Sequence, residues 1–118
     1  MQEFPPASEL SHLIGDELAQ VCLDPYQIQF RFQRNSIAAE FAVEQIEPDG
    51  TVWRYRCVAA EAGEAMLHRL IGKKIEAVKT EGLRMTISFD NGAALCVLSE
   101  ASPYESGHIG GQGKFIVF

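Results

Sequence analysis

The stretch Leu70-Ile71-Gly72, with the strand pattern that follows it up to Phe89, repeats an earlier part of this chain. The earlier copy begins at Leu13-Ile14-Gly15 and runs to Phe32, at a constant offset of 57 residues. The identical residues fall where a helix end and a strand interior need them. The sequence therefore predicts one domain, residues 1–118, with an internal duplication into repeats of about residues 5–58 and 59–118.

In each repeat, the Leu-Ile-Gly sequence closes a short apolar stripe. In the first repeat, Leu10, Leu13 and Ile14 are spaced i, i+3 and i+4, which is typical of one face of an α-helix. Residues 59–71 carry a similar stripe. The glycine that follows each stripe is a natural helix stop, because glycine readily adopts positive φ. We therefore expect two α-helices.

Alternating apolar and polar residues after each helix predict antiparallel strands. The clearest is residues 27–33, in which Phe30 and Phe32 share one face. A two-residue turn at Arg34-Asn35 would place Phe32 opposite Ile37. The other expected strands are residues 18–23, 37–43, 52–58, 74–80, 83–90, 94–97 and 115–118.

The predicted fold class is α+β. Two α-β-β-β-β repeats would form one or more antiparallel sheets of about eight strands, with the two helices packed on one face. The pattern leaves open whether two four-stranded sheets are continuous, stacked or partly closed.

Two further turns set strand registers. Pro48-Asp49-Gly50 predicts a three-residue turn that pairs Val43 with Tyr55 and, on the outer face, Glu44 with Arg54. Cross-strand ion pairs explain the charges of this face better than a catalytic carboxylate pair does.

Asn91-Gly92 predicts a two-residue hairpin turn that would place Phe89 opposite Ala94. This register leaves Leu95 and Val97 on the face turned away from the core. A second copy of the chain could pack on that face, or on a spare strand edge, to form a homodimer.

Composition excludes several classes of function. Apolar residues make up 47% and charged residues 22% of the 118 residues, as in ordinary globular domains. The net charge of −6, without a basic cluster, argues against nucleic acid as a partner. No apolar run is long enough to predict a membrane span. Three cysteines without a CxxC motif favour a reducing, cytoplasmic location.

The long connection at residues 99–113 is the main candidate for a functional site. Long loops in compact domains are often functional, and this one contains side chains suited to recognition or acid–base chemistry. The candidate binding residues are Tyr104, Glu105, Ser106 and His108. A solvated, glycine-rich flap without function is the competing interpretation.

Trp53, the only tryptophan, is a further candidate binding residue, although core packing explains it as well. Cys57 and Cys96 fall on predicted inward faces, where thiols are usually inert. The three histidines lack the spacing of metal ligands. We therefore expect no catalytic residue, no metal and no cofactor.

Three stretches carry a resemblance to a known family: Leu70-Ile71-Gly72, Phe89-Asp90-Asn91-Gly92 and Pro103-Tyr104-Glu105-Ser106. Together they resemble a family of small uncharacterised bacterial α+β domains. Many of its members have an aromatic residue shortly after the last motif, where this chain has Gly107-His108. Some comparable small domains are immunity proteins that bind and block a toxin, and the resemblance suggests a similar role here.

The leading functional hypothesis is a small cytoplasmic interaction module without enzymatic activity, and a toxin-neutralising protein is its most concrete form. The alternative is a small-molecule-binding protein or enzyme whose pocket is gated by the loop at residues 99–113. Tyr104, Glu105 and His108 would be the polar groups of that pocket.

Overall fold

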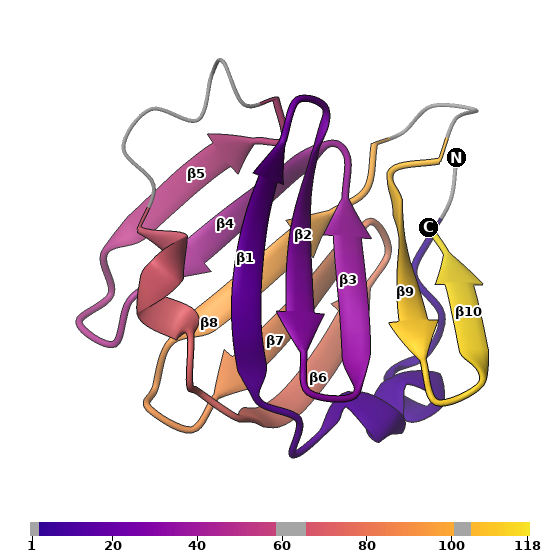
Figure 1. Ribbon diagram of the computed structural model, residues 1–118, viewed down its shortest axis with the longest axis horizontal. Helices are drawn as coiled ribbons and strands as arrows, with labels where there is room; N and C mark the ends of the chain where they lie inside the picture. Colours follow the sequence, from indigo (N-terminus) through magenta and orange to yellow (C-terminus); the bar gives the residue numbers. More distant parts are fainter. Residues whose placement is uncertain (1–2, 59–65, 101–104) are drawn as a thin grey trace.

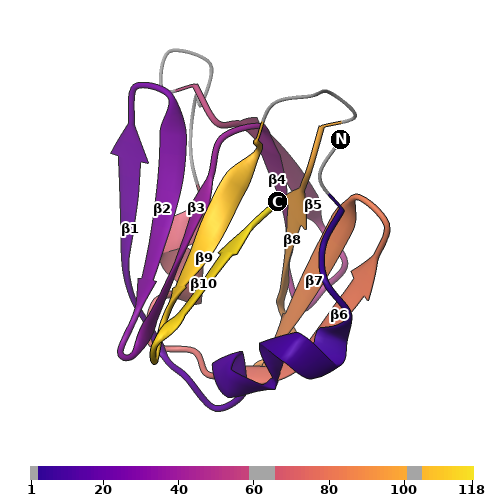
Figure 2. The same cartoon turned by 90° about the vertical axis from the view of Figure 1, so that its right-hand side faces the viewer.

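The computed structural model of the protein describes residues 3–58, 66–100 and 105–118. These residues form two five-stranded antiparallel sheets, with strand orders β1-β2-β3-β9-β10 and β5-β4-β8-β7-β6. Figure 2 shows the sheets edge-on as two stacked layers. The prediction of antiparallel sheets is confirmed, and the architecture is a β-sandwich.

The strands of the first sheet are β1 (Leu18–Asp24), β2 (Gln27–Phe32), β3 (Asn35–Ala39), β9 (Gly107–Gly111) and β10 (Lys114–Val117). The strands of the second sheet are β4 (Ala42–Ile46), β5 (Val52–Arg56), β6 (Ile75–Glu81), β7 (Arg84–Phe89) and β8 (Ala94–Leu98). Two short 3₁₀ helices, η1 (Ala7–Leu13) and η3 (Leu67–Leu70), precede β1 and β6.

Each half of the chain contributes three strands to one sheet and a hairpin to the other (Figure 1). Strands β1 to β3 belong to the first sheet, and the chain then crosses over to form β4 and β5 in the second. The second half does the reverse, because β6 to β8 lie in the second sheet and β9 and β10 extend the first. Each sheet is therefore completed by a hairpin from the other half.

Reciprocal backbone hydrogen bonds join the two halves where the Leu-Ile-Gly sequences end. Gly15 N donates to the carbonyl oxygen of Ile75 at 2.7 Å, and Gly72 N donates to that of Leu18 at 2.8 Å. Both glycines have positive φ, 89° and 87°, a conformation that costs other residues free energy. The two repeated glycines thus have the same structural role. At each one, the positive φ directs the chain so that the glycine N–H can donate the hydrogen bond that links the halves.

The interior between the sheets is apolar, as the alternating strand patterns predict. Its members on β2 and β7 are Ile28, Phe30, Phe32, Met85, Ile87 and Phe89, all buried. The rings of Phe4 and Phe118 stack with their centroids 4.4 Å apart, which brings both ends of the described chain into this core.

The prediction of an α+β fold with two helices packed on a sheet is wrong. The described helical segments are short 3₁₀ helices, in which residues i and i+3 lie on the same side. Leu10 and Leu13 are accordingly buried, whereas Ile14, which an α-helical stripe would bury, is 51% exposed. Part of the second predicted helix, residues 59–65, lies outside the described residues. No helix in the described segments is long and apolar enough to cross a membrane.

The predicted strand at residues 37–43 is two strands in different sheets. The chain leaves β3 at Ala39 and begins β4 at Ala42, with an exposed Glu40 between them. Its continuous alternation of apolar and polar residues hides the crossover, because a strand that changes sheets keeps its inner face toward the same core.

The predicted loop at residues 99–113 contains β9, which pairs with both β3 and β10. Its glycines suggest a loop, yet two of them, Gly107 and Gly111, allow close packing. A Cβ atom on Gly107 would lie 2.0 Å from the carbonyl oxygen of Ala38 and 2.5 Å from the Phe118 ring. A Cβ on Gly111 would meet Asn35 Oδ1 at 2.5 Å. Glycine in a strand often marks such a close approach.

The register around Asp49 is confirmed, since Val43 pairs with Tyr55 and Glu44 with Arg54. The register predicted from Arg34-Asn35 is wrong by two residues, because Ile37 pairs with Phe30 instead of Phe32. That error keeps every side chain on its predicted face, since side chains alternate with a period of two.

The Asn91-Gly92 register is wrong by one residue, which reverses the faces of β8. Only Gly92 of the pair has positive φ, and the Asn91 side chain accepts a hydrogen bond from Ala93 N at 3.1 Å. The turn therefore has three residues, like the one at Asp49. Leu95 and Val97 are fully buried in the core, so they offer no face for a homodimer.

Replacing Gly107 by alanine should destabilise the protein by about 3 kcal/mol, because it adds a steric overlap to an unfavourable φ of 153°. Gly82→Ala is the matched control, since φ there is also positive (58°) but no atom lies within 4 Å of the added Cβ. Urea denaturation of both variants measures the difference. Equal losses of stability would show that the close approach of β9 to β3 is not required.

Candidate functional site

The outer face of the first sheet carries two rows of side chains across β2, β3, β9 and β10. One row is Arg31, Ser36, Gly110 and Phe115. The neighbouring row is Gln29, Ala38, His108 and Val117. The positions on β3 and β9 are mostly small, whereas those on β2 and β10 are large. The face is therefore low in the middle and higher at its sides.

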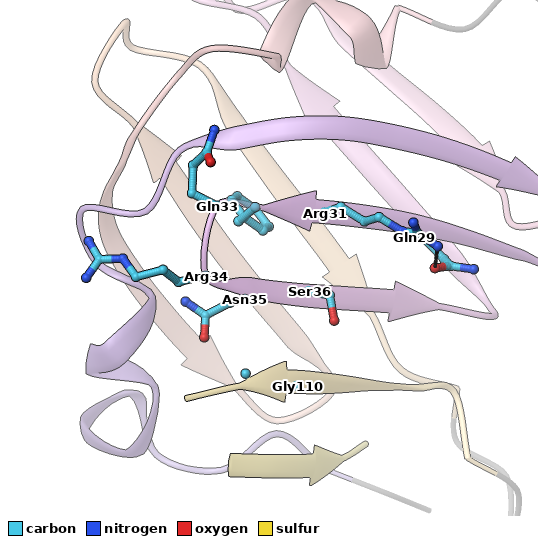
Figure 3. A pocket seen from close by; sticks show the side chains of 9 residues that line it. Gln29, Arg31, Gln33, Arg34, Asn35, Ser36 and Gly110 are labelled. Carbon is cyan, nitrogen blue, oxygen red and sulfur yellow. Dashed lines mark hydrogen bonds between the residues drawn. The ribbon is translucent and has the colours of Figure 1, made fainter. Parts of the chain in front are cut away.

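An open hollow of about 510 Å³ lies on this face, over the ends of β2, β3 and β9 (Figure 3). Its lining residues are Gln29, Arg31, Phe32, Gln33, Arg34, Asn35, Ser36, Gly110 and Gly111. A Cβ on Gly110 would lie 3.7 Å from Ser36 Oγ, so the absence of a side chain there keeps the floor low. Amide, hydroxyl and guanidinium groups make the hollow mainly a hydrogen-bonding site.

Both arginines of the hollow lack a carboxylate or aromatic partner within the described part of the chain. Arg31 donates to the side-chain oxygen of Gln29 at 3.2 Å. The remaining arginines do have such partners: Arg54 and Arg84 pair with Glu44 at 3.4 and 2.9 Å, Arg69 pairs with Glu47, and Arg56 lies over the Phe41 ring. In a chain of net charge −6, two unpaired guanidiniums at one hollow are a local positive charge.

A buried carboxylate holds the turn that carries Arg34. Asp16 is 2% exposed and accepts hydrogen bonds from Arg34 N at 3.1 Å and from Asn35 Nδ2 at 2.7 Å. Asn35 Nδ2 also lies 3.4 Å from the carbonyl oxygen of His12, so the turn is tied to η1. Asp16 therefore binds the backbone of Arg34 and leaves its guanidinium available.

Of the residues proposed from the 99–113 segment, those that the structure describes do not converge on one site. Tyr104 lies outside the described residues, and Glu105 is exposed. Ser106 is buried, and its hydroxyl accepts a hydrogen bond from Glu100 N at 2.8 Å. His108 lies on the outer face of β9, where its ring contacts that of Phe115 with centroids 5.1 Å apart. Their binding role stays a prediction, and His108 alone borders the face that bears the hollow.

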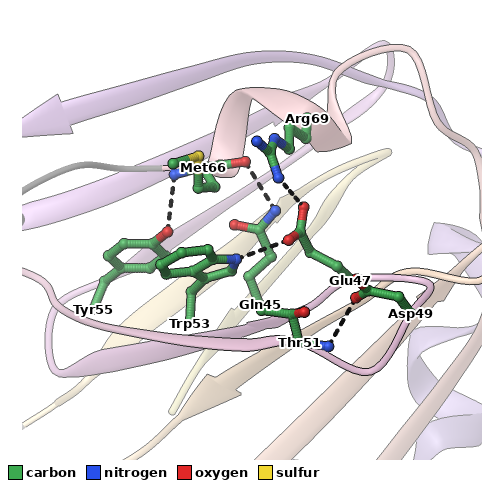
Figure 4. A network of polar contacts seen from close by, with 8 residues as sticks. All are labelled: Gln45, Glu47, Asp49, Thr51, Trp53, Tyr55, Met66 and Arg69. Carbon is green, nitrogen blue, oxygen red and sulfur yellow. Dashed lines mark hydrogen bonds and ion pairs between the residues drawn. The ribbon is translucent and has the colours of Figure 1, made fainter.

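Trp53 lies on the second sheet, within a polar network that joins β5 to η3 (Figure 4). Its indole nitrogen donates to Glu47 Oε2 at 3.0 Å, and the other oxygen of Glu47 pairs with Arg69. These two bonds lower the pKa of the Glu47 carboxyl. Nearby, the Tyr55 hydroxyl accepts a hydrogen bond from Met66 N at 2.8 Å. The network anchors the chain before η3, which gives Trp53 a structural role.

Two of the three cysteine thiols, Cys57 and Cys96, are buried, where a thiol is usually unreactive. Burial raises the pKa of the Cys57 thiol to about 12. The prediction that Cys96 faces the core is wrong. Its thiol is buried on the outer face of the second sheet, and its sulfur lies 3.1 Å from Arg84 Nη2. Within the part of the chain that the structure describes, no three His, Cys, Asp or Glu side chains are grouped to hold a metal ion.

No family model, no curated protein and no solved structure matches this chain. The resemblance to small bacterial α+β domains therefore stays a prediction.

The hollow itself was missed from the sequence. The alternation of residues 27–33 places Arg31 on the outer face, but β9, which supplies Gly110 and Gly111 to the hollow, comes from the other half of the chain.

Alkylation of the native protein at mildly alkaline pH should modify Cys22 and spare Cys57 and Cys96. Cys22 is the half-buried thiol of the three, whereas the other two are buried. Mass spectrometry after brief treatment with iodoacetamide, with and without urea, tests this. Rapid modification of Cys57 in the native state would contradict its place in the core.

Acid should destabilise the protein partly through His12. Burial, followed by the charge of Lys114, lowers the pKa of His12 below 6.5, although the nearby backbone of Glu9 acts in the opposite direction. Between the two pKa values, the unfolded chain binds the proton and the folded chain does not, so stability falls as the pH drops. His12→Gln should flatten this dependence between about pH 7.5 and 5.5 in urea denaturation. Parallel curves for wild type and variant would contradict it.

Proposed function

We propose that this protein is a non-enzymatic binding module that docks another protein on the outer face of its first sheet. The observation that carries the proposal is the coincidence, on one face, of an open hollow, two unpaired arginines and an exposed aromatic ring. Phe115 is 63% exposed, and it pairs across the strands with Gly110 of the hollow. Aromatic residues and arginine are the types most enriched at the centres of protein interfaces.

The shape of the hollow favours a protein over a small molecule. Small-molecule sites enclose most of the ligand surface in a concave, largely apolar pocket. This hollow lies on the face of a sheet and is open to solvent. The proposed gating loop of the alternative hypothesis is also less suitable as a gate, because residues 107–111 form the paired strand β9.

A toxin-neutralising role is the most concrete form of this proposal, and it rests on the sequence resemblance alone. The cytoplasmic location belongs to the proposal as well. It is supported by three free cysteines, two of them buried. Such thiols are typical of proteins from reducing compartments.

The test is affinity capture from a lysate of the cells that make the protein, with tagged wild type, Phe115→Ser and Val52→Ser. Val52 is the matched control, because it is 56% exposed but lies on the second sheet. We expect a stoichiometric protein partner with wild type and Val52→Ser, and at least about tenfold less with Phe115→Ser, the effect of losing one interface anchor. No partner, or a partner that Phe115→Ser retains in full, would refute the proposal.

A further inference from the structure

The hollow of the first sheet has a charge and a shape that specify its occupant more closely. We infer that it holds an extended acidic segment of the partner protein, with carboxylate side chains at alternate positions that bind Arg31 and Arg34. This inference rests on the proposed function, since it names the chemistry of what docks on the same face.

Charge complementarity with Arg31 and Arg34 favours an acidic segment. Arg31 and Arg34 have no carboxylate partner in the described chain, so their charges are available to another molecule. The nearest buried carboxylate, Asp16, is already hydrogen-bonded to Arg34 N and Asn35 Nδ2. At physiological ionic strength, charges beyond about 8 Å are largely screened. Asp24 is another carboxylate near the hollow, and it accepts hydrogen bonds from Gln27 and Gln29. Arg31 and Arg34 are exposed, whereas Asp16 is buried and Asp24 half-buried, so the guanidiniums are the charged groups that an acidic segment would meet first.

The positions of the two arginines decide between a compact anion and an extended segment. Figure 3 shows Arg34 at the turn end of the hollow, with its side chain directed away from Arg31, which is turned along β2 toward Gln29. The guanidiniums do not converge on one point, so a single phosphate or carboxylate would bind only one of them. An extended chain places every second side chain on the same side, about 7 Å apart, and so presents several acidic groups in a line.

The floor between the arginines suits a peptide backbone. Gly110 presents no side chain, and the Ser36 hydroxyl lies beside it, 3.7 Å from where a Cβ would be. The Ser36 hydroxyl and the Gln33 amide can donate to carbonyl oxygens of the segment. Phe115, next to Gly110, offers an apolar contact on the far side. The hollow therefore combines two guanidinium groups and a low floor, and the exposed Phe115 ring lies on the neighbouring strand β10.

The experiment measures fluorescence anisotropy of labelled synthetic peptides with the full chain. One peptide has glutamate at every second position. The controls are the same peptide with glutamine, and a peptide with the same number of glutamates in one block. We expect the alternating peptide to bind, the glutamine peptide not to bind, and the block peptide to bind more weakly. Absence of measurable binding, or equal affinity for the block peptide, would overturn the inference.

Variants of the protein then locate the site. Arg31→Gln and Arg34→Gln should each weaken binding of the alternating peptide by about tenfold, as expected for one charge-assisted hydrogen bond. Arg56→Gln is the matched control, because it removes an exposed arginine on the second sheet and should leave the affinity unchanged. Equal affinities in all three variants would overturn the inference.

Inorganic phosphate separates a peptide site from a simple anion site. Phosphate titrated in NMR experiments should shift the resonances of Arg31 and Arg34 only weakly, and it should not displace the peptide at equal concentration. Saturable phosphate binding that excludes the peptide would assign the hollow to a small oxyanion and overturn the inference. A captured partner that depends on Phe115 but not on Arg31 or Arg34 would refute this inference alone and leave the proposed binding module intact.

Discussion

Reciprocal backbone hydrogen bonds join the two halves of the chain, from Gly15 N to the carbonyl oxygen of Ile75 and from Gly72 N to that of Leu18. These bonds connect the starts of β1 and β6, which belong to different sheets. Each half then sends a hairpin to complete the sheet of the other. Because these contacts are distant in sequence, folding requires both halves together, and the loop-closure entropy is offset only when the common core forms.

The scaffold is nearly symmetric, but its two outer faces differ in chemistry. On the second sheet, Glu44 pairs with Arg54 and Arg84, and Arg84 covers the buried thiol of Cys96. The charges of Glu44, Arg54 and Arg84 on that face therefore form ion pairs with one another. On the first sheet, Arg31 and Arg34 have no carboxylate partner among the described residues. Exposed ion pairs contribute little to the free energy of unfolding. Guanidiniums without a carboxylate partner, beside an open hollow, are therefore better explained by binding to another molecule.

Local patterns predicted much of the fold. The alternation of residues 27–33 identified the inner face of β2, and the Pro48-Asp49-Gly50 turn gave the register of β4 and β5. The helices were misjudged because Leu10 and Leu13 fit an α-helical stripe and a 3₁₀ helix equally well. Strand β9 was missed because Gly107 and its neighbouring glycines have the composition of a loop.

The candidate site was beyond sequence reasoning for a topological reason. Arg31 and Ser36 come from the first half of the chain and Gly110 from the second, so the hollow exists only after the hairpin exchange. The proposed binding surface is therefore the outer face of the first sheet. Methyl NMR of the protein in complex with its captured partner tests this most directly. We expect shifts at Ala38 and Val117, on the outer face of the first sheet. Shifts confined to Thr86 and Ala94, on the outer face of the second sheet, would contradict it.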